Sequence, residues 1–134
     1  MPSPREVFEH MQRSWLAADG GRFDDLLADD AVVEMPFAPA GRASRIEGRE
    51  RFRAFAAPQR AAFPVRFDEV RDVVVHDTAD PEVIVVEYEL AGTVTTTGRR
   101  ASAPFIGVLR VHNGKIARWR EYQDMPAITA ALLS

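Results

Sequence analysis

The amino-acid sequence predicts an α+β fold, with helices packed on one face of a curved antiparallel sheet. The first half of the chain shows helical spacing of apolar residues, and the second half shows strand-like runs joined by turn-forming segments. Helices followed by an antiparallel meander are typical of this class. We expect residues 1–134 to form a single domain, since 134 residues suffice for one hydrophobic core.

The first helix has a complete N-terminal signal. Ser3 and Glu6 form a capping box, with Pro4 at the first helical position. Apolar residues then recur at three- and four-residue spacing and give the helix one apolar face: Val7, Phe8, Met11 and Trp15. The two glycines at 20–21 are expected to end this helix.

The rest of the first half predicts two further helices, with a strand and a loop between them. The expected helices cover residues 22–27 and 49–57, and the latter is expected to end before Pro58 because proline disfavours helical geometry in the residue before it. The short strand covers residues 31–35, and the loop covers residues 37–47.

The second half predicts four strands and a closing helix. The Asn113-Gly114 pair is the strongest hairpin signal among the turns. The expected strands cover residues 65–76, 83–95, 99–111 and 115–124. A short apolar helix over 127–133 closes the chain. This order makes the four strands an antiparallel meander.

Alternation along the strands predicts which side chains face the helices. On the last strand Arg118 and Arg120 share one face, and two adjacent arginines point that face outward. Ile116 and Tyr122 share the arginine face. Three residues of the opposite face are therefore expected to point inward: Trp119, Glu121 and Gln123.

The run at 99–111 is largely apolar on both faces. One of these faces must be the outer face of the sheet, and an apolar outer face often means that a partner packs on it. We therefore expect a homodimer through the outer face of the sheet.

Glu121 is the best candidate for chemistry. A carboxylate among aromatic side chains should have a raised pKa, because desolvation disfavours its charged form, and such a group suits general acid or base work near neutral pH. The alternative is a structural carboxylate satisfied by a backbone amide, a tyrosine or an arginine. Glu34 is a second candidate, although alternation places it opposite Met35 and so outward, unless a bulge before Pro36 reverses it.

Several residues are candidates for ligand contact. They are mostly large apolar side chains on faces expected to point inward: Trp15, Met35, Phe55, Tyr88, Phe105, Trp119 and Gln123. The alternative for the aromatic ones is an ordinary place in the hydrophobic core.

The composition argues against several other functions. The chain has no cysteine, which excludes disulfides and thiolate chemistry. The net charge is −3 with no basic block, so we expect no nucleic-acid partner. The three histidines lack metal-ligand spacing, so we expect no metal and no cofactor. No apolar run approaches the ~20 residues of a membrane span, and no signal peptide is evident, so we expect no membrane partner and a cytoplasmic protein.

Short motifs at the junctions resemble a known family. The motifs are Ala-Asp-Asp-Ala-x-x-x-x-Pro at 28–36, Gly-Arg-Glu at 48–50, and Gly-Lys-Ile followed by Trp-Arg-Glu-Tyr-x-Asp within 114–124. They are similar to SnoaL-like proteins of the nuclear-transport-factor-two-like superfamily. The resemblance implies a sheet wrapped around three N-terminal helices, forming a cone with an internal pocket for a small apolar molecule. This fold hosts isomerases, polyketide cyclases, epoxide hydrolases, dehydratases and binding modules.

Two enzyme types of the superfamily can be compared position by position. The catalytic positions of ketosteroid isomerase fall at Met35, Gly107 and Ser14, which cannot perform that mechanism. Limonene-epoxide hydrolase is the closer match, because its water-activating base falls at Glu121. Its other catalytic positions fall at Glu34, Val32, Tyr88 and Leu90.

Two functions stay open on these residues. The first is a cofactor-independent hydrolase, isomerase or cyclase with Glu121 as general acid or base on an apolar substrate. The second is a non-catalytic ligand-binding or dimerisation module. The retained acid favours the first function, and the loss of its catalytic partners favours the second.

Overall fold

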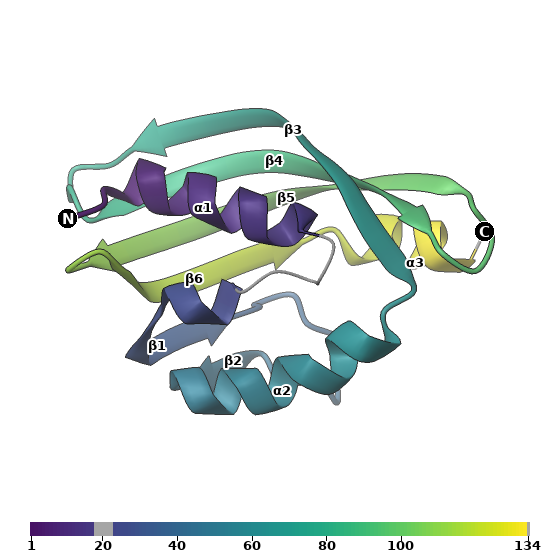
Figure 1. Ribbon diagram of the computed structural model, residues 1–134, viewed down its shortest axis with the longest axis horizontal. Coiled ribbons are helices and arrows are strands. Elements are labelled where there is room, and N and C mark those ends of the chain that lie inside the picture. The colour runs from purple at the N-terminus through teal and green to yellow at the C-terminus, as the bar shows by residue number, and fades with distance from the viewer. Residues whose placement is uncertain (18–22, 134) are drawn as a thin grey trace.

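The computed structural model describes residues 1–17 and 23–133, and it shows helices packed against a curved six-stranded sheet (Figure 1). The helical segments are α1 (Pro4–Leu16), η1 (Phe23–Leu26), α2 (Arg49–Ala62) and α3 (Met125–Leu133). The strands are β1 (Leu27–Glu34), β2 (Arg45–Glu47), β3 (Val65–Asp77), β4 (Val83–Val94), β5 (Arg100–His112) and β6 (Lys115–Gln123). The predicted α+β class, with helices ahead of a meander, is confirmed.

The helix α1 begins as predicted. The Ser3 hydroxyl accepts a hydrogen bond from the Glu6 amide at 3.2 Å, and the Ser3 amide donates to the Glu6 carboxylate at 3.1 Å. The helix ends at Leu16, and the expected stop at glycines 20–21 lies outside the described residues. The buried face of α1 packs on β3, β4 and β5.

Three boundary predictions in the first half were wrong. The expected second helix is a single 3₁₀ turn, because fully buried Leu27 already belongs to β1 and pairs with β6. The expected loop contains β2, whose Ile46 is buried against the sheet. The helix α2 continues through Pro58. Pro58 and Ala54 are both exposed, so the carbonyl group that loses its partner to proline can bond to water.

The sheet is mixed, so the purely antiparallel sheet predicted from the sequence needs correction. Its strand order is β2-β1-β6-β5-β4-β3, with β3 to β6 as the predicted meander. The strand β1 runs parallel to β6 and places Val33 beside Trp119. A parallel partner arises because the chain crosses from β1 to the far edge through β2 and α2 before the meander begins (Figure 1).

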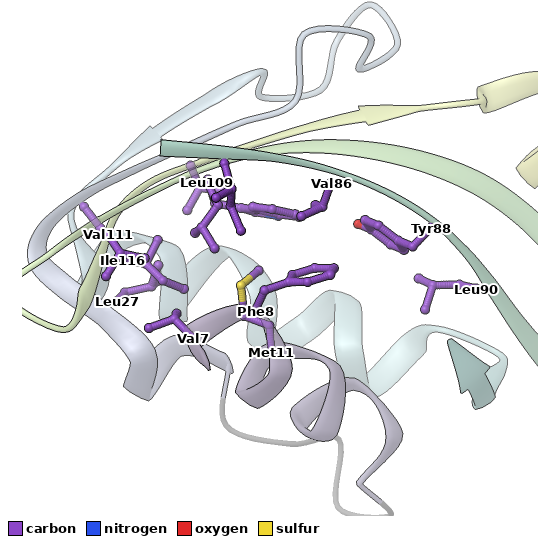
Figure 2. Packing of buried hydrophobic residues seen from close by; sticks show 14 residues of the cluster. Val7, Phe8, Met11, Leu27, Val86, Tyr88, Leu90, Leu109, Val111 and Ile116 are labelled. Carbon is purple, nitrogen blue, oxygen red and sulfur yellow. The ribbon is translucent and has the colours of Figure 1, made fainter. Parts of the chain in front are cut away.

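The inner face of the sheet forms the core with α1. Figure 2 shows Phe8 and Met11 of α1 beneath Val86 and Tyr88 of β4. Trp119 is 3% exposed, as predicted for the inner face, but Ile116 was assigned to the wrong face and is fully buried. The register between β5 and β6 shifts between Arg110 and Val111, and this bulge turns Ile116 inward.

No helix within the described ranges is long and apolar enough to cross a membrane.

Candidate functional site

The candidate site is a hydrogen-bonded group of three side chains on the inner face of β4 and β6. The Tyr88 hydroxyl donates to one carboxylate oxygen of Glu121 at 3.2 Å, and the Gln123 amide donates to the other at 2.9 Å. Tyr88 is buried, whereas Glu121 and Gln123 are half-buried. Alternation along β6 brings Glu121 and Gln123 to the same face, and the meander brings β4 within reach of them. The carboxylate is therefore held by neutral donors at the edge of the core, and Trp119 adds a hydrogen bond to those from Tyr88 and Gln123.

Aromatic rings hold Tyr88 in place from both sides. Its ring is stacked with Phe105 at 5.5 Å and with Trp15 at 5.2 Å between centroids. Phe8 lies 5.7 Å from the same ring. Stacked rings restrict the side-chain torsions of Tyr88, so its hydroxyl stays directed at Glu121. Trp15, Tyr88 and Phe105, which the sequence placed on inward faces, are thus brought together.

Burial decides the protonation behaviour of the pair. Burial raises the pKa of the Glu121 carboxyl group, and hydrogen bonds from Gln123, Tyr88 and Trp119 partly oppose the rise. Burial, followed by the charge of Glu121, raises the pKa of the Tyr88 hydroxyl well above its usual value. Tyr88 therefore remains a proton donor to Glu121 at every physiological pH, while Glu121 is the group able to gain or lose a proton.

A glycine makes room for the indole ring of Trp119 beside Glu121. Gly107 of β5 pairs directly with Glu121 of β6, and a Cβ atom at position 107 would overlap the six-membered ring of Trp119. The space that a side chain at position 107 would fill is therefore occupied by the ring of Trp119. This steric demand explains why the residue here is glycine.

Glu34 lies on the outer face and is not brought together with Glu121. Its carboxylate forms ion pairs with Arg118 at 3.1 Å, Arg120 at 3.2 Å and Arg45 at 3.3 Å. The bulge needed to turn Glu34 inward does not occur, because Val33 keeps the buried position beside Trp119. The structure thus gives Glu34 three cationic partners and no contact with the Tyr88–Glu121 pair.

The two remaining ligand candidates lie on other elements. Met35 is half-buried directly after β1, and its amide donates to the Ser44 carbonyl at 2.8 Å. Phe55 is half-buried on α2, where its ring lies 6.5 Å from Phe52. Their role in ligand contact stays a prediction.

Two hollows open at the surface of the molecule. One of about 610 Å³ is lined by outer-face residues such as Glu87 and Ile106, and it also reaches Tyr88, Phe105 and Gln123 of the candidate site. Another of about 350 Å³ lies between the start of α1 and the β3–β4 turn. Among the described residues, no group of three or more histidine, aspartate or glutamate side chains could hold a metal ion.

Sequence reasoning missed two features of the site. The three arginines around Glu34 come from β2 and β6, and their convergence depends on the parallel pairing of β1 with β6, which no local pattern signals. The fit of Trp119 over Gly107 was also missed. A glycine inside an otherwise β-branched and aromatic strand was the available signal, because such a residue often marks a close approach by another group.

The arrangement of helices and sheet defines the class of protein as the nuclear-transport-factor-two-like α+β cone. A protein of this fold from Anabaena variabilis superposes with a TM-score of 0.64, covering 89% of this chain and 84% of its own at 20% identity. The chain belongs to the SnoaL-like family, whose domain model matches residues 7–119. An uncharacterised PhzA/B-like protein of Pseudomonas aeruginosa is 32% identical over 118 residues, which cover 88% of this chain and 82% of the relative.

Solved structures with this fold include several described as enzymes. A proposed isomerase from Bacillus subtilis matches with a TM-score of 0.84 at 24% identity, covering 96% of this chain and 91% of its own. The Δ5-3-ketosteroid isomerase of a Mycobacterium species matches with a TM-score of 0.71 at 24% identity, covering 94% of this chain and 97% of its own. An epoxide hydrolase of the limonene-epoxide-hydrolase type from Mycobacterium tuberculosis matches with a TM-score of 0.62 at 26% identity, covering 95% of this chain and 86% of its own. A proposed polyketide cyclase from Pseudomonas putida matches with a TM-score of 0.77 at 22% identity, covering 98% of both chains.

Proposed function

We propose that the chain binds a small, mostly apolar molecule at the mouth of the cone, and that Glu121 acts on it as general base or general acid. The reaction class is an isomerisation, a cyclisation or the hydrolysis of an epoxide. The observation that carries this proposal is the environment of Glu121: its carboxylate is desolvated, its pKa is raised, and it is held by the neutral donors Tyr88 and Gln123.

The pair of Glu121 and Tyr88 has complementary roles in such reactions. In an isomerisation or a cyclisation, Glu121 takes a proton from a carbon next to a carbonyl group. The Tyr88 hydroxyl then turns from the neutral Glu121 carboxyl group and donates its hydrogen bond to the oxygen that gains charge. In an epoxide hydrolysis, Glu121 takes a proton from water as the water oxygen bonds to an epoxide carbon, the C–O bond of the epoxide breaks, and Tyr88 protonates the released oxygen. Glu121 then returns the proton to Tyr88 along their hydrogen bond. Structural neighbours described as an isomerase and an epoxide hydrolase support these classes.

Two single-ring probe substrates test the catalytic role. Purified protein is assayed for conversion of 3-cyclohexen-1-one to its conjugated isomer and for hydrolysis of styrene oxide. We expect turnover of at least one probe, and we expect Glu121→Gln to lower it by about 10²- to 10⁴-fold, the usual contribution of a general base. Glu34→Gln is the matched control, because it neutralises a carboxylate on the opposite face and should leave turnover unchanged.

The catalytic proposal is contradicted by equal turnover in wild type and Glu121→Gln. It is equally contradicted by a wild type that converts neither probe and in which Glu121 titrates at the ordinary value of about 4.3.

A second function, a non-catalytic binding or dimerisation module, is favoured by the apolar outer face. Ile106 of β5 and Val74 of β3 are 44% and 46% exposed there, on either side of Glu87 of β4, and such an exposed apolar face often marks a site where a partner packs. We propose that a second copy of the chain covers this face. Sedimentation velocity should give a dimer for the wild type and a monomer for Ile106→Glu, while Phe63→Ser, at the end of α2, should stay dimeric. A monomeric wild type at micromolar concentration contradicts this proposal.

A further inference from the structure

The outer face of the sheet has an apolar middle and two charged flanks. The middle is β5, which lies between β4 and β6 (Figure 1). Three of its apolar side chains point outward: Pro104, Ile106 and Val108. Ile106 pairs with Glu87 of β4, and Val108 pairs with Arg120 of β6. Charged side chains therefore begin directly on either side of the apolar strand.

The acidic flank lies on β3 and β4. It carries four carboxylates: Glu69, Asp72, Glu87 and Glu89. Arg71 stands among them and contacts Glu89 at 2.9 Å and Glu69 at 3.4 Å. His76 lies 2.6 Å from the carboxylate of Glu87, whose side chain is 50% exposed. Because the carboxylates outnumber the arginine, this flank presents negative charge at the surface.

The basic flank lies on β1, β2 and β6. Arg45, Arg118 and Arg120 surround a single carboxylate, that of Glu34. The Glu34 side chain is 16% exposed and the arginine side chains are 31–47% exposed, so the positive charge lies outermost. Glu47 pairs with Arg45 at 2.9 Å, on the strand farthest from β5. Arg118 and Arg120 are therefore the cations that this flank presents next to the apolar strand.

A second copy can pack face to face on this sheet in two limiting orientations. The two-fold axis lies in the plane between the sheets, because the same face must point inward in both copies. An axis along β5 places the acidic flank of each copy over the basic flank of the other. An axis across the strands places each flank over the same flank of the partner, where like charges oppose association.

We propose that a second copy docks on the outer face with its two-fold axis along β5, so that the acidic flank of each copy contacts the basic flank of the other. This inference rests on the proposed dimerisation and adds its orientation. The apolar strand β5 of each copy lies at the centre of the interface, and the charged flanks form its rim. Burial of β5 drives association, and the flanks select the orientation.

The salt dependence of the wild-type dimer tests the orientation without any variant. Sedimentation equilibrium gives the Kd of the dimer in about 50 mM and about 500 mM NaCl. Because salt screens exposed charges, contact between opposite flanks predicts a Kd at least about threefold higher at the higher salt concentration. Contact between like flanks predicts a dimer that becomes tighter, since salt then screens a repulsion. An unchanged or lower Kd therefore overturns the orientation.

Two charge reversals, Glu87→Lys and Arg120→Glu, test the contact between the flanks. The symmetry of the dimer repeats each contact, so either reversal places like charges together twice, and we expect Kd to rise at least about tenfold. Glu9→Lys, at an exposed position of α1, is the matched control and should dimerise as the wild type does. Circular dichroism checks that each variant is folded, and Arg118→Glu replaces Arg120→Glu if the latter does not fold, because both arginines belong to the same flank.

A mixture of the two single variants gives the sharpest result. When the chain with Glu87→Lys pairs with the chain with Arg120→Glu, both contacts join opposite charges again. We expect the mixture to dimerise about as tightly as the wild type, although each variant alone is mainly monomeric at the same concentration. The double variant restores both contacts within a homodimer, and we expect it to recover the wild-type Kd as well.

The outcomes separate the orientation from the proposed functions. Single reversals that dimerise like the wild type overturn the orientation, and so does a mixture no tighter than either variant alone. Both results leave the dimer itself and the loss of turnover in Glu121→Gln intact. A monomeric wild type removes the proposed dimer and its orientation together.

Discussion

Two carboxylates on neighbouring strands, Glu121 and Glu34, lie on opposite faces of the sheet and have opposite surroundings. On the inner face, Glu121 is held by a tyrosine hydroxyl and a glutamine amide. On the outer face, Glu34 is surrounded by the guanidinium groups of Arg45, Arg118 and Arg120. Residue type is the same at both positions, so the chemistry that each can perform is set by its partners.

The comparison shows why only the inner carboxylate is a candidate for proton transfer. A group in contact with neutral donors and apolar rings is easily protonated, since nothing cationic stabilises its charge there, and burial raises the pKa of Glu121 accordingly. An anion between three cations is a link between strands, and it ties β1 and β2 to β6. The following predictions test this contrast, from the largest expected effect to the smallest.

The largest effect on stability is expected from the indole ring beside Glu121. Trp119→Ala leaves a cavity in a core that cannot collapse onto it, and we expect the free energy of unfolding to fall by about 3–5 kcal/mol. On the outer face of the same strand, Tyr122 is half-buried and its ring lies 5.4 Å from that of exposed Phe37, so Tyr122→Ala should cost about 1 kcal/mol. Urea unfolding of both variants measures the difference, and equal losses contradict the assigned faces.

The ion pairs of Glu34 should give an intermediate effect that depends on salt. Glu34→Gln removes the anion between three arginines that are 31–47% exposed, and we expect a loss of about 1 kcal/mol at low ionic strength. Because salt screens exposed charges, the loss should shrink in 1 M NaCl. A loss that does not respond to salt would show that Glu34 contributes through packing instead.

Glu121→Gln should raise the stability of the folded protein at neutral pH, whereas Glu34→Gln lowers it, and the effect of Glu121→Gln should depend on pH. Because burial raises the pKa of Glu121 in the folded chain above its value in the unfolded chain, the folded wild type loses stability as pH rises through the raised pKa. The stability of the variant relative to the wild type should therefore increase between pH 3.5 and pH 7, by about 1.4 kcal/mol for each unit by which the pKa is raised. Thermal unfolding at both pH values measures this increase, and a relative stability independent of pH contradicts the burial of an ionisable group.

The smallest effect is expected from the Tyr88 hydroxyl. Tyr88→Phe keeps the stacked ring but removes a hydrogen bond that favours the charged form of Glu121. The pKa of Glu121 should therefore rise further. Titration of ¹³C-labelled glutamate in both proteins measures the change. A pKa that falls in Tyr88→Phe would mean that the hydroxyl is not a donor to Glu121.

Local patterns predicted the elements that depend on neighbouring residues. The capping box of α1, the Asn113-Gly114 hairpin and the inward positions of Trp119 and Glu121 all follow from short-range rules. The four strands of the meander also follow from local rules, because the alternation of residue types along each strand indicates that one face of the sheet is buried.

Features that depend on distant partners could not be predicted. Ile116 faces inward because of a bulge opposite Val111, and β2 exists because β1 offers it an open edge. The three arginines at Glu34 follow from the parallel pairing of β1 with β6. The packing of the Trp119 ring on Gly107 likewise involves residues of two strands. A single sequence does not state which residues of one strand lie opposite those of another.

The most direct test of the central claim is the pKa of Glu121 in the wild-type protein, with Glu34 as internal reference. Glutamate side chains labelled with ¹³C are followed by NMR from pH 3 to pH 9, and the signal of Glu121 is assigned from the Glu121→Gln variant. We predict a pKa clearly above the ordinary ~4.3 for Glu121. A value at or below ~4.3 would show that its carboxylate is well solvated or paired with a cation, and it would contradict the role of this residue as the proton-transferring group.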